Sequence, residues 1–207
     1  MFFVEILMSW IKTIKYAEAS GDLLNLYKQV TGPNNNVDNI MMAHSLRPHT
    51  MQGHMTLYKY TLHHPKNAID KWFLECIGVF VSMLNNCHYC VDHHFIGMTR
   101  LLNNQQKAAT IKSELYSKDF SLLNSKQVIA LDYAKELTLY PDKLKQSFIQ
   151  NMRIKGWDDG EILEINQVAA YFNYANRTVL GLGVNIDGDD LGLSPNNSED
   201  ISDWNHS

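Results

Sequence analysis

Apolar residues recur every three or four positions along most of the chain, which is the spacing of a helix with one buried face. This pattern begins near Ile11 and continues to Leu180. Gly, Pro and Asn interrupt it at points where helices commonly stop. No stretch alternates between apolar and polar residues as a half-buried strand would. The pattern predicts an all-α domain of about eight to ten helices.

These interruptions divide the chain into a series of expected helices. The first runs from about Ile11 to Val30, and the polar stretch Asn34-Asn35-Asn36 ends it. The later ones are expected at 37–63 with a joint near Arg47-Pro48, at 67–84, at 87–102, at 105–116, after an N-cap at Asn124 or Ser125, between Pro141 and Gly156, and after Asp158. Asp158 and Glu161 have the spacing of a capping box, with Asp in place of the usual Ser or Thr.

The segment 67–84 is apolar on nearly every side, so we expect a buried helix there. Asn85-Asn86 follows it, and Asn favours both the end of one helix and the N-cap of the next. With Asn86 as the N-cap, Cys87 would lie in the first turn of the following helix.

A change in composition after Gly183 suggests how the chain is organised. Residues 1–186 are expected to form a single all-α domain. Residues 187–207 are rich in Gly, Asp, Asn and Ser and are expected to form a polar, irregular C-terminal tail.

The composition suits one globular domain, since 45% of the 207 residues are hydrophobic. The formal net charge is only −4 and no run of Lys or Arg is present, which argues against nucleic acid as a main partner. No apolar stretch reaches the roughly eighteen residues of a membrane span. The apolar N-terminus contains Glu5 and has no basic residues before it, so it does not resemble a signal peptide. We therefore expect a cytoplasmic protein with no membrane partner.

The stretch ECIGVFVSMLNNCHYCVDHH, residues 75–94, contains all three cysteines of the chain. Cys87, Cys90 and His94 stand at i, i+3 and i+7, so one helix would present them on one face. A thiol at a helix N-terminus favours the thiolate, and a histidine one turn away can exchange its proton. Glu75 belongs to the preceding helix and could orient His94. The helix N-terminus favours Cys87 as the more acidic thiol, whereas the histidine favours Cys90.

Other interpretations of this stretch compete with a reactive thiol pair. Zinc could be bound by Cys87, Cys90, His94 and either Glu75 or His93, although no second ligand pair follows along the chain. The two cysteines could also pack as small apolar residues.

Several residues near the motif are expected to have structural roles. Cys76 is expected to be an inert core thiol, His88 to point away from the thiols, and His93 to be exposed or to contact another subunit. The histidines of the preceding segment are expected to be solvated or to cap helices; they are His44, His49, His54, His63 and His64. Asn173, Asn176 and Arg177 interrupt an apolar helix and are expected to hydrogen-bond at a helix–helix or subunit contact.

The residues Glu75, Cys87-x-x-Cys90 and His94 resemble the signature of the AhpD-like alkylhydroperoxidases, in the carboxymuconolactone decarboxylase superfamily. Ser82 and Asn86-Cys87-His88-Tyr89-Cys90 resemble the form found in the peroxidase-related branch. Two further segments, 45–63 and 156–184, are similar to the regions before and after the motif in that branch. Most of residues 10–186 is covered by the resemblance.

The resemblance implies an all-α fold with a repeated helical unit, a homo-oligomer (dimer, trimer or hexamer) and no cofactor. It implies a peroxidase-type oxidoreductase with antioxidant chemistry, in which a small hydroperoxide is reduced and an external dithiol, protein or small molecule, restores the thiols. Cys90 would be the peroxidatic thiol, Cys87 the resolving thiol, and Glu75 with His94 the proton relay. A carboxymuconolactone decarboxylase-like enzyme and a non-enzymatic zinc-binding protein are the alternatives on the same fold.

One position departs from the best-known members of that family. They have a histidine immediately before the second cysteine, as part of the relay, and Tyr89 occupies this position here. The resemblance therefore implies an altered or shorter relay.

Overall fold

A computed structural model describes residues 8–32 and 36–193 of the chain. Within these residues the chain is helical and has no strand, which confirms the all-α prediction. The elements in chain order are the 3₁₀ turn η1 (Tyr16–Glu18), α1 (Gly21–Val30), α2 (Asn39–Ala43), α3 (Pro48–Tyr58), the π-helical turn η2 (Lys59–His63), α4 (Lys71–Leu84), α5 (His88–Leu102), α6 (Gln105–Ser117), α7 (Ser125–Leu139), the 3₁₀ turn η3 (Pro141–Lys143), α8 (Gln146–Ile154) and α9 (Asp159–Leu182).

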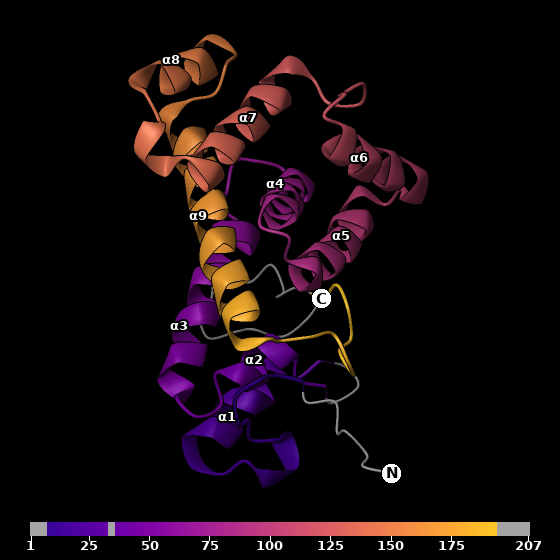
Figure 1. The fold of residues 1–207 in the computed structure, drawn as a ribbon, viewed down its shortest axis with the longest axis vertical. Helices are drawn as coiled ribbons and strands as arrows, with labels where there is room; N and C mark the ends of the chain where they lie inside the picture. The colour runs from indigo at the N-terminus through magenta and orange to yellow at the C-terminus, as the bar shows by residue number, and fades with distance from the viewer. Residues whose placement is uncertain (1–7, 33–35, 194–207) are drawn as a thin grey trace.

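Helix α4 lies at the centre of the upper part of the molecule, surrounded by α5, α7 and α9 (Figure 1). Every residue from Phe73 to Ser82 is buried. A helix with neighbours on several sides can be apolar all round, which explains the composition that predicted it. The long helix α9 extends from this centre to the lower part, where α1, α2 and α3 are found (Figure 1).

The predicted capping residues begin their helices as expected. Asn124 accepts a hydrogen bond from the N–H group of Gln127 at 2.9 Å, and this capping box begins α7. Asp158 accepts one from Glu161 at 2.8 Å and begins α9. Helix α9 ends at Gly183, whose φ of 61° is the left-handed conformation that glycine adopts readily.

The helix expected from Ile11 onward begins later than predicted. The backbone N–H group of Trp10 donates to the carbonyl of Leu182 at 2.8 Å, and the Ser9 hydroxyl donates to the same oxygen at 2.9 Å. This segment therefore uses its hydrogen bonds at the end of α9. Among the described residues before α1, 8–20, the short turn η1 is the only helical element. The joint at Arg47-Pro48 is confirmed, since α3 begins at Pro48.

The C-terminal end of α3 widens into the π-helical turn η2. A π turn contains more residues than an α turn, so side chains after it rotate away from the faces that an α-helical spacing predicts. Such turns are frequent at functional sites. No helix in the described ranges is long and apolar enough to cross a membrane.

Candidate active site

A tight turn between α4 and α5 places the two cysteines of the CxxC motif. Asn85 ends α4, and Asn86 follows with a left-handed φ of 55°. The N–H group of Cys87 donates to the carbonyl of Ser82 at 2.9 Å, and that of Asn86 to the carbonyl of Met83 at 3.1 Å. These two bonds form a Schellman motif, in which Asn can take the left-handed position.

The N-cap of α5 is Cys87 itself, which corrects the prediction that Asn86 would hold this position. An N-cap residue has a non-helical, usually extended backbone. The left-handed Asn86 does not supply one, so the helix begins one residue later. The carbonyl of Cys87 accepts the N–H group of Val91 at 3.0 Å, and its side chain lies beside the helix N-terminus. The partial positive charge there stabilises a thiolate.

The two thiols of the motif have unequal environments. Both are free and buried, Cys87 completely and Cys90 with 2% of its surface exposed. A hydrogen bond between the side chains lowers the pKa of Cys87 and, together with burial, raises the pKa of Cys90. Cys90 lines the cavity described below, whereas Cys87 does not. Cys87 is therefore the more acidic thiol and Cys90 the more accessible one.

Asn176 of α9 connects the two helices that carry the motif. Its amide donates to the Ser82 hydroxyl at 3.0 Å and accepts from the Asn85 side chain at 2.9 Å. This confirms the prediction of hydrogen bonding at a helix–helix contact. The Asn176 side chain also hydrogen-bonds both cysteines and acts to lower the pKa of each.

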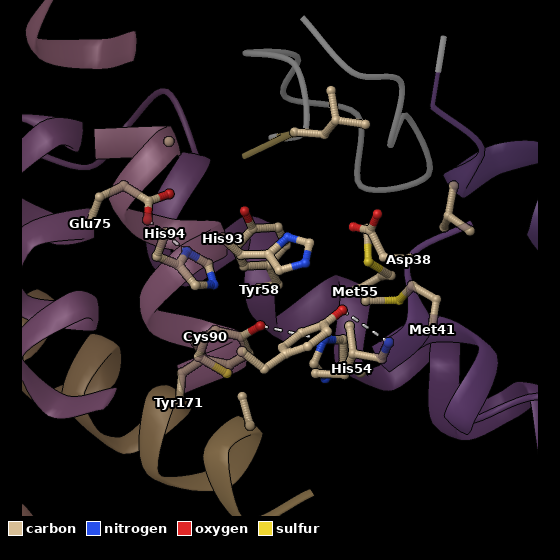
Figure 2. Close-up of a pocket in the computed structure, with 16 residues that line it drawn as sticks. Asp38, Met41, His54, Met55, Tyr58, Glu75, Cys90, His93, His94 and Tyr171 are labelled. Atoms are coloured by element: carbon tan, nitrogen blue, oxygen red, sulfur yellow. Dashed lines mark hydrogen bonds and ion pairs between the residues drawn. The ribbon is translucent and has the colours of Figure 1, made fainter. Parts of the chain in front are cut away.

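Glu75 projects from α4 toward α5 and holds His94, as predicted for two helices folded against each other. Its Oε2 atom lies 2.7 Å from Nδ1 of His94 (Figure 2). Its Oε1 atom lies 3.1 Å from Nε2 of His63, which is also 3.1 Å from the hydroxyl of Tyr58. Burial alone would raise the pKa of Glu75, but the two imidazoles lower it to about 2. Glu75 is thus an ionised, buried carboxylate between two histidines.

A small cavity opens beside these groups. Figure 2 shows Glu75, His94 and Cys90 on one side of it and Asp38, Met41 and Met55 on the other. Its volume is about 50 Å³, which is far below the roughly 300–1,000 Å³ of sites for drug-sized ligands. Apolar and aromatic side chains cover much of its wall; they include Ile40, Met41, Met55, Tyr58, Tyr171 and Leu193. The cavity therefore suits a small, largely apolar molecule.

Tyr89, the residue before Cys90, is engaged by the C-terminal segment. Its hydroxyl donates to Asp189 at 2.7 Å and accepts from the N–H group of Ile40 at 3.2 Å. His93 Nε2 lies 3.2 Å from the same Asp189 oxygen. Burial and the Asp189 charge raise the pKa of Tyr89 well above its usual value, so this phenol is a poor proton donor.

His93 and residues 187–193 differ from what the sequence predicted. His93 is 7% exposed and pairs with Asp189, so it is not a surface residue. Residues 187–193 are irregular, as expected of the tail, but they pack on the domain: the Asn39 amide donates to the carbonyl of Asp187 at 3.0 Å, and Leu193 lines the cavity. The remainder of the tail, 194–207, lies outside the described residues.

His54 and His63 are also buried, although the sequence suggested solvated or capping roles. His54 is 2% exposed, lines the cavity and places Nε2 3.4 Å from the hydroxyl of Tyr171. Burial lowers the pKa of His54 to about 3, with the nearby His44 and His94 acting in the same direction. It is a neutral imidazole at the wall of the site.

The structure also shows the surroundings of Cys76 and of the candidate zinc ligands. Cys76 is completely buried, and burial raises its pKa to about 12, as expected of an inert core thiol. Within the described ranges, no group of three or more His, Cys, Asp or Glu side chains is arranged to hold a metal ion. The oxygens of Glu75 instead face His63 and His94. The zinc alternative therefore gains no support from the arrangement.

The structure brings Glu75, Cys87, Cys90 and His94 into one site, and adds residues that sequence reasoning missed. His54 carried a recognisable signal, because Met51, His54 and Tyr58 fall on one helical stripe and are all buried. His63 carried none, because it lies in the π turn η2, where the α-helical register no longer holds. Asp189 approaches Tyr89 from 100 residues away, and no local pattern reveals such a contact.

Comparison with known proteins supports the same fold. No family model matches the chain. Among curated proteins, an uncharacterized protein, YdfG, from Bacillus subtilis is 20% identical over 140 residues, which are 68% of this chain and 91% of that protein.

Solved structures give more extensive matches. An AhpD-core, peroxidase-related protein from Ralstonia eutropha superimposes with a TM-score of 0.76 at 19% identity, covering 88% of this chain and 94% of that one. The debrominase Bmp8 superimposes with a TM-score of 0.70 at 17% identity over 89% and 94% of the two chains, and a cysteine-to-alanine variant of it has been solved with 2,3,4-tribromopyrrole. The helical arrangement, with α4 surrounded by α5, α7 and α9, is therefore the AhpD-like fold shared with peroxidase-related proteins.

Proposed function

We propose that this protein is a thiol-dependent peroxidase that reduces a small hydroperoxide with Cys90 and Cys87. One observation carries the proposal: Cys90 faces a small cavity, next to a histidine oriented by a buried carboxylate and in hydrogen-bond contact with a second thiol. This is the set of groups that a two-cysteine peroxidase requires.

The roles follow from access, because Cys90 lines the cavity and Cys87 does not. His94 uses Nδ1 to hold Glu75, which leaves Nε2 to take the proton of the Cys90 thiol. The Cys90 thiolate attacks the O–O bond of ROOH, its sulfur is oxidised to a sulfenic acid, and the departing alkoxide receives a proton from His94 and leaves as ROH. Cys87, the more acidic thiol, then attacks the Cys90 sulfur, and water leaves as the disulfide forms. An external dithiol reduces this disulfide in two exchange steps and becomes a disulfide itself.

The lining of the cavity indicates the substrate class. A volume of about 50 Å³ and a wall of Met, Tyr and aliphatic side chains favour a small alkyl hydroperoxide or hydrogen peroxide. A homo-oligomer (dimer, trimer or hexamer), a repeated helical unit and a dithiol partner complete the proposal and rest on the resemblance to the AhpD-like proteins. The cytoplasmic location expected from the sequence is also part of the proposal.

A titration with tert-butyl hydroperoxide tests the function. The mass of the wild-type protein is expected to fall by that of two hydrogen atoms as Cys87 and Cys90 form a disulfide. Cys87→Ser is expected to accumulate a trappable sulfenic acid on Cys90, whereas Cys90→Ser is not. Cys76→Ser serves as the matched control and should behave as the wild type. Thiols that stay free in the native protein under excess peroxide would exclude this function, and a sulfenic acid on Cys87 in Cys90→Ser would reverse the two roles.

A second candidate is the removal of bromine from a small halogenated ring, which is the activity that the name of the debrominase Bmp8 indicates for that protein. The rings of Tyr58 and Tyr171 at the cavity wall favour a flat apolar substrate. In this reaction the thiolate takes bromine from carbon, the ring carbon gains a proton, and Cys87 displaces bromide as the disulfide forms. Bromide release from 2,3,4-tribromopyrrole, compared with alcohol release from tert-butyl hydroperoxide, separates the two candidates. A decarboxylase-like activity would instead survive Cys90→Ser.

A further inference from the structure

The carboxylate of Glu75 is shared between two imidazoles from different parts of the chain. His94 lies 2.7 Å from one oxygen and belongs to α5, within the motif. His63 lies 3.1 Å from the other oxygen and belongs to η2, before α4. The side chains of Glu75 and His63 are 1% and 3% exposed, whereas that of His94 is 15% exposed. Water therefore has little access to the inner side of this carboxylate.

Tyr58 contacts both imidazoles. Its hydroxyl lies 3.1 Å from Nε2 of His63, and its ring meets the rings of His63 and His94 edge-on, with centroids 4.9 and 5.9 Å away. Tyr58 lines the cavity and His63 does not. His63 thus reaches the reacting groups through Glu75 and Tyr58, without touching the substrate site.

A buried carboxylate with few donors tends to take up a proton, because burial disfavours its charged form. A second imidazole at 3.1 Å from the other oxygen favours the ionised form of the carboxylate. An ionised Glu75 in turn stabilises the imidazolium of His94 that forms when the thiol loses its proton. Tyr89 cannot take the place of this imidazole, because its hydroxyl is committed to Asp189.

We propose that His63 is a positioning residue of the thiol site, which holds Glu75 ionised so that His94 can accept the Cys90 proton. This inference rests on the proposed function and names a residue for it outside the motif. The titratable groups packed around Glu75 and the two histidines are Tyr58 and His54 of α3, Cys90 of α5 and Tyr171 of α9. Burial raises the pKa of Tyr171, and Tyr58, Cys90 and Glu75 act in the same direction.

The pH dependence of thiol alkylation by iodoacetamide tests the role of His63 without any peroxide. His63→Leu removes the imidazole beside Glu75, so the pH midpoint for alkylation of the Cys87–Cys90 pair is expected to rise by about one unit. At a fixed pH below the midpoint, the alkylation rate is expected to fall about tenfold. His63→Gln retains an N–H group near the position of Nε2 and should restore most of the difference. His64→Leu changes the adjacent, partly exposed histidine and should match the wild type.

A lower unfolding temperature in His63→Leu with an unchanged alkylation midpoint would reduce His63 to a structural residue and overturn the inference. Histidine side-chain ¹⁵N NMR of the wild-type protein gives a second measurement that requires no variant. Nε2 of His63 and Nδ1 of His94 should both carry protons near pH 7, and an unprotonated Nε2 on His63 would overturn the inference even if His63→Leu does not fold. Neither measurement involves peroxide. The role of His63 can therefore be confirmed or refuted whether or not the protein proves to be a peroxidase.

Discussion

Gly78 of α4 and Phe172 of α9 lie so close that a Cβ atom on Gly78 would come within 2.1 Å of the phenyl ring. The same ring packs edge-on against His94, with the centroids 4.5 Å apart. The close approach of α4 and α9 at this glycine therefore helps to set the position of the imidazole of His94, which lines the cavity together with Cys90.

Replacing Gly78 by alanine is expected to destabilise the protein and to displace His94. Overpacking of a core costs about 1–3 kcal/mol, and the gain in helix propensity of about 1 kcal/mol offsets only part of it. Denaturant unfolding should show a lower midpoint, and thiol alkylation at neutral pH should slow. Gly53→Ala in α3 is the matched control, because no atom lies within 4 Å of its added Cβ; it should be neutral or stabilising. Equal effects of the two substitutions would contradict the packing argument.

Glu75→Gln is expected to lower kcat/KM for the hydroperoxide by about 10²-fold, as is typical when a group needed for proton transfer is lost. The substitution keeps the shape of the side chain but removes the charge that stabilises the imidazolium of His94. Steady-state peroxide consumption measures the change. Glu114→Gln is the control, since this carboxylate binds Ser121 and Leu122 on another part of the molecule, and its activity per folded protein should equal that of the wild type. A Glu75→Gln variant with full activity would remove Glu75 from the relay.

Tyr89→Phe is expected to loosen residues 186–193 and to lower the free energy of unfolding by about 1–2 kcal/mol. The substitution leaves the buried carboxylate of Asp189 without its 2.7 Å hydrogen bond. Hydrogen exchange of this segment measures the loosening. Tyr116→Phe, on an exposed side chain of α6, should leave both quantities unchanged. Unaltered exchange in Tyr89→Phe would show that other contacts hold the segment.

His54 should make the stability of the protein sensitive to acid between pH 6.5 and about pH 3. Its pKa is about 3 in the folded protein and 6.5 when exposed. Stability from a neutral His54 is therefore complete above pH 6.5, and it is lost as the pH falls toward 3, because the unfolded chain binds the proton first. The loss approaches about 1.4 kcal/mol per pH unit. The free energy of unfolding, measured with denaturant, should change less with pH over this window in His54→Gln than in the wild type. In His64→Gln it should change as much as in the wild type. If the free energy of unfolding depended on pH in the same way in all three proteins, His54 would not be the group responsible.

Asp38 is expected to select against anionic hydroperoxides in a pH-dependent way. Burial raises its pKa to about 7, although nearby His93 acts to lower it. At pH 8 the ionised carboxylate at the cavity should repel a carboxylate-bearing hydroperoxide relative to an uncharged one of similar size. Below pH 7 protonation removes this discrimination, and Asp38→Asn should remove it at every pH. Competition assays between the two substrates measure the ratio, and a ratio that does not change with pH would exclude this role.

The sequence by itself determined the local structure around the thiols. Helical periodicity predicted the buried helix α4, and the capping residues Asn124 and Asp158 predicted the starts of α7 and α9. The spacing of Cys87, Cys90 and His94 predicted a shared helical face, because one helix geometry fixes the directions of neighbouring side chains. Glu75 could be assigned to the same site from the sequence, because a short turn must bring α4 against α5.

Only the tertiary structure decided which groups control the thiols. His63 reaches Glu75 from the last position of a π turn, whose extra residue breaks the helical register. Asp189 reaches Tyr89 across 100 residues, and Asn176 reaches the CxxC turn from α9. Sequence patterns report the faces of single elements, whereas these contacts depend on how separate elements pack. The left-handed Asn86 likewise moved the start of α5 by one residue, because the hydrogen bonds that end α4 took precedence over an N-cap.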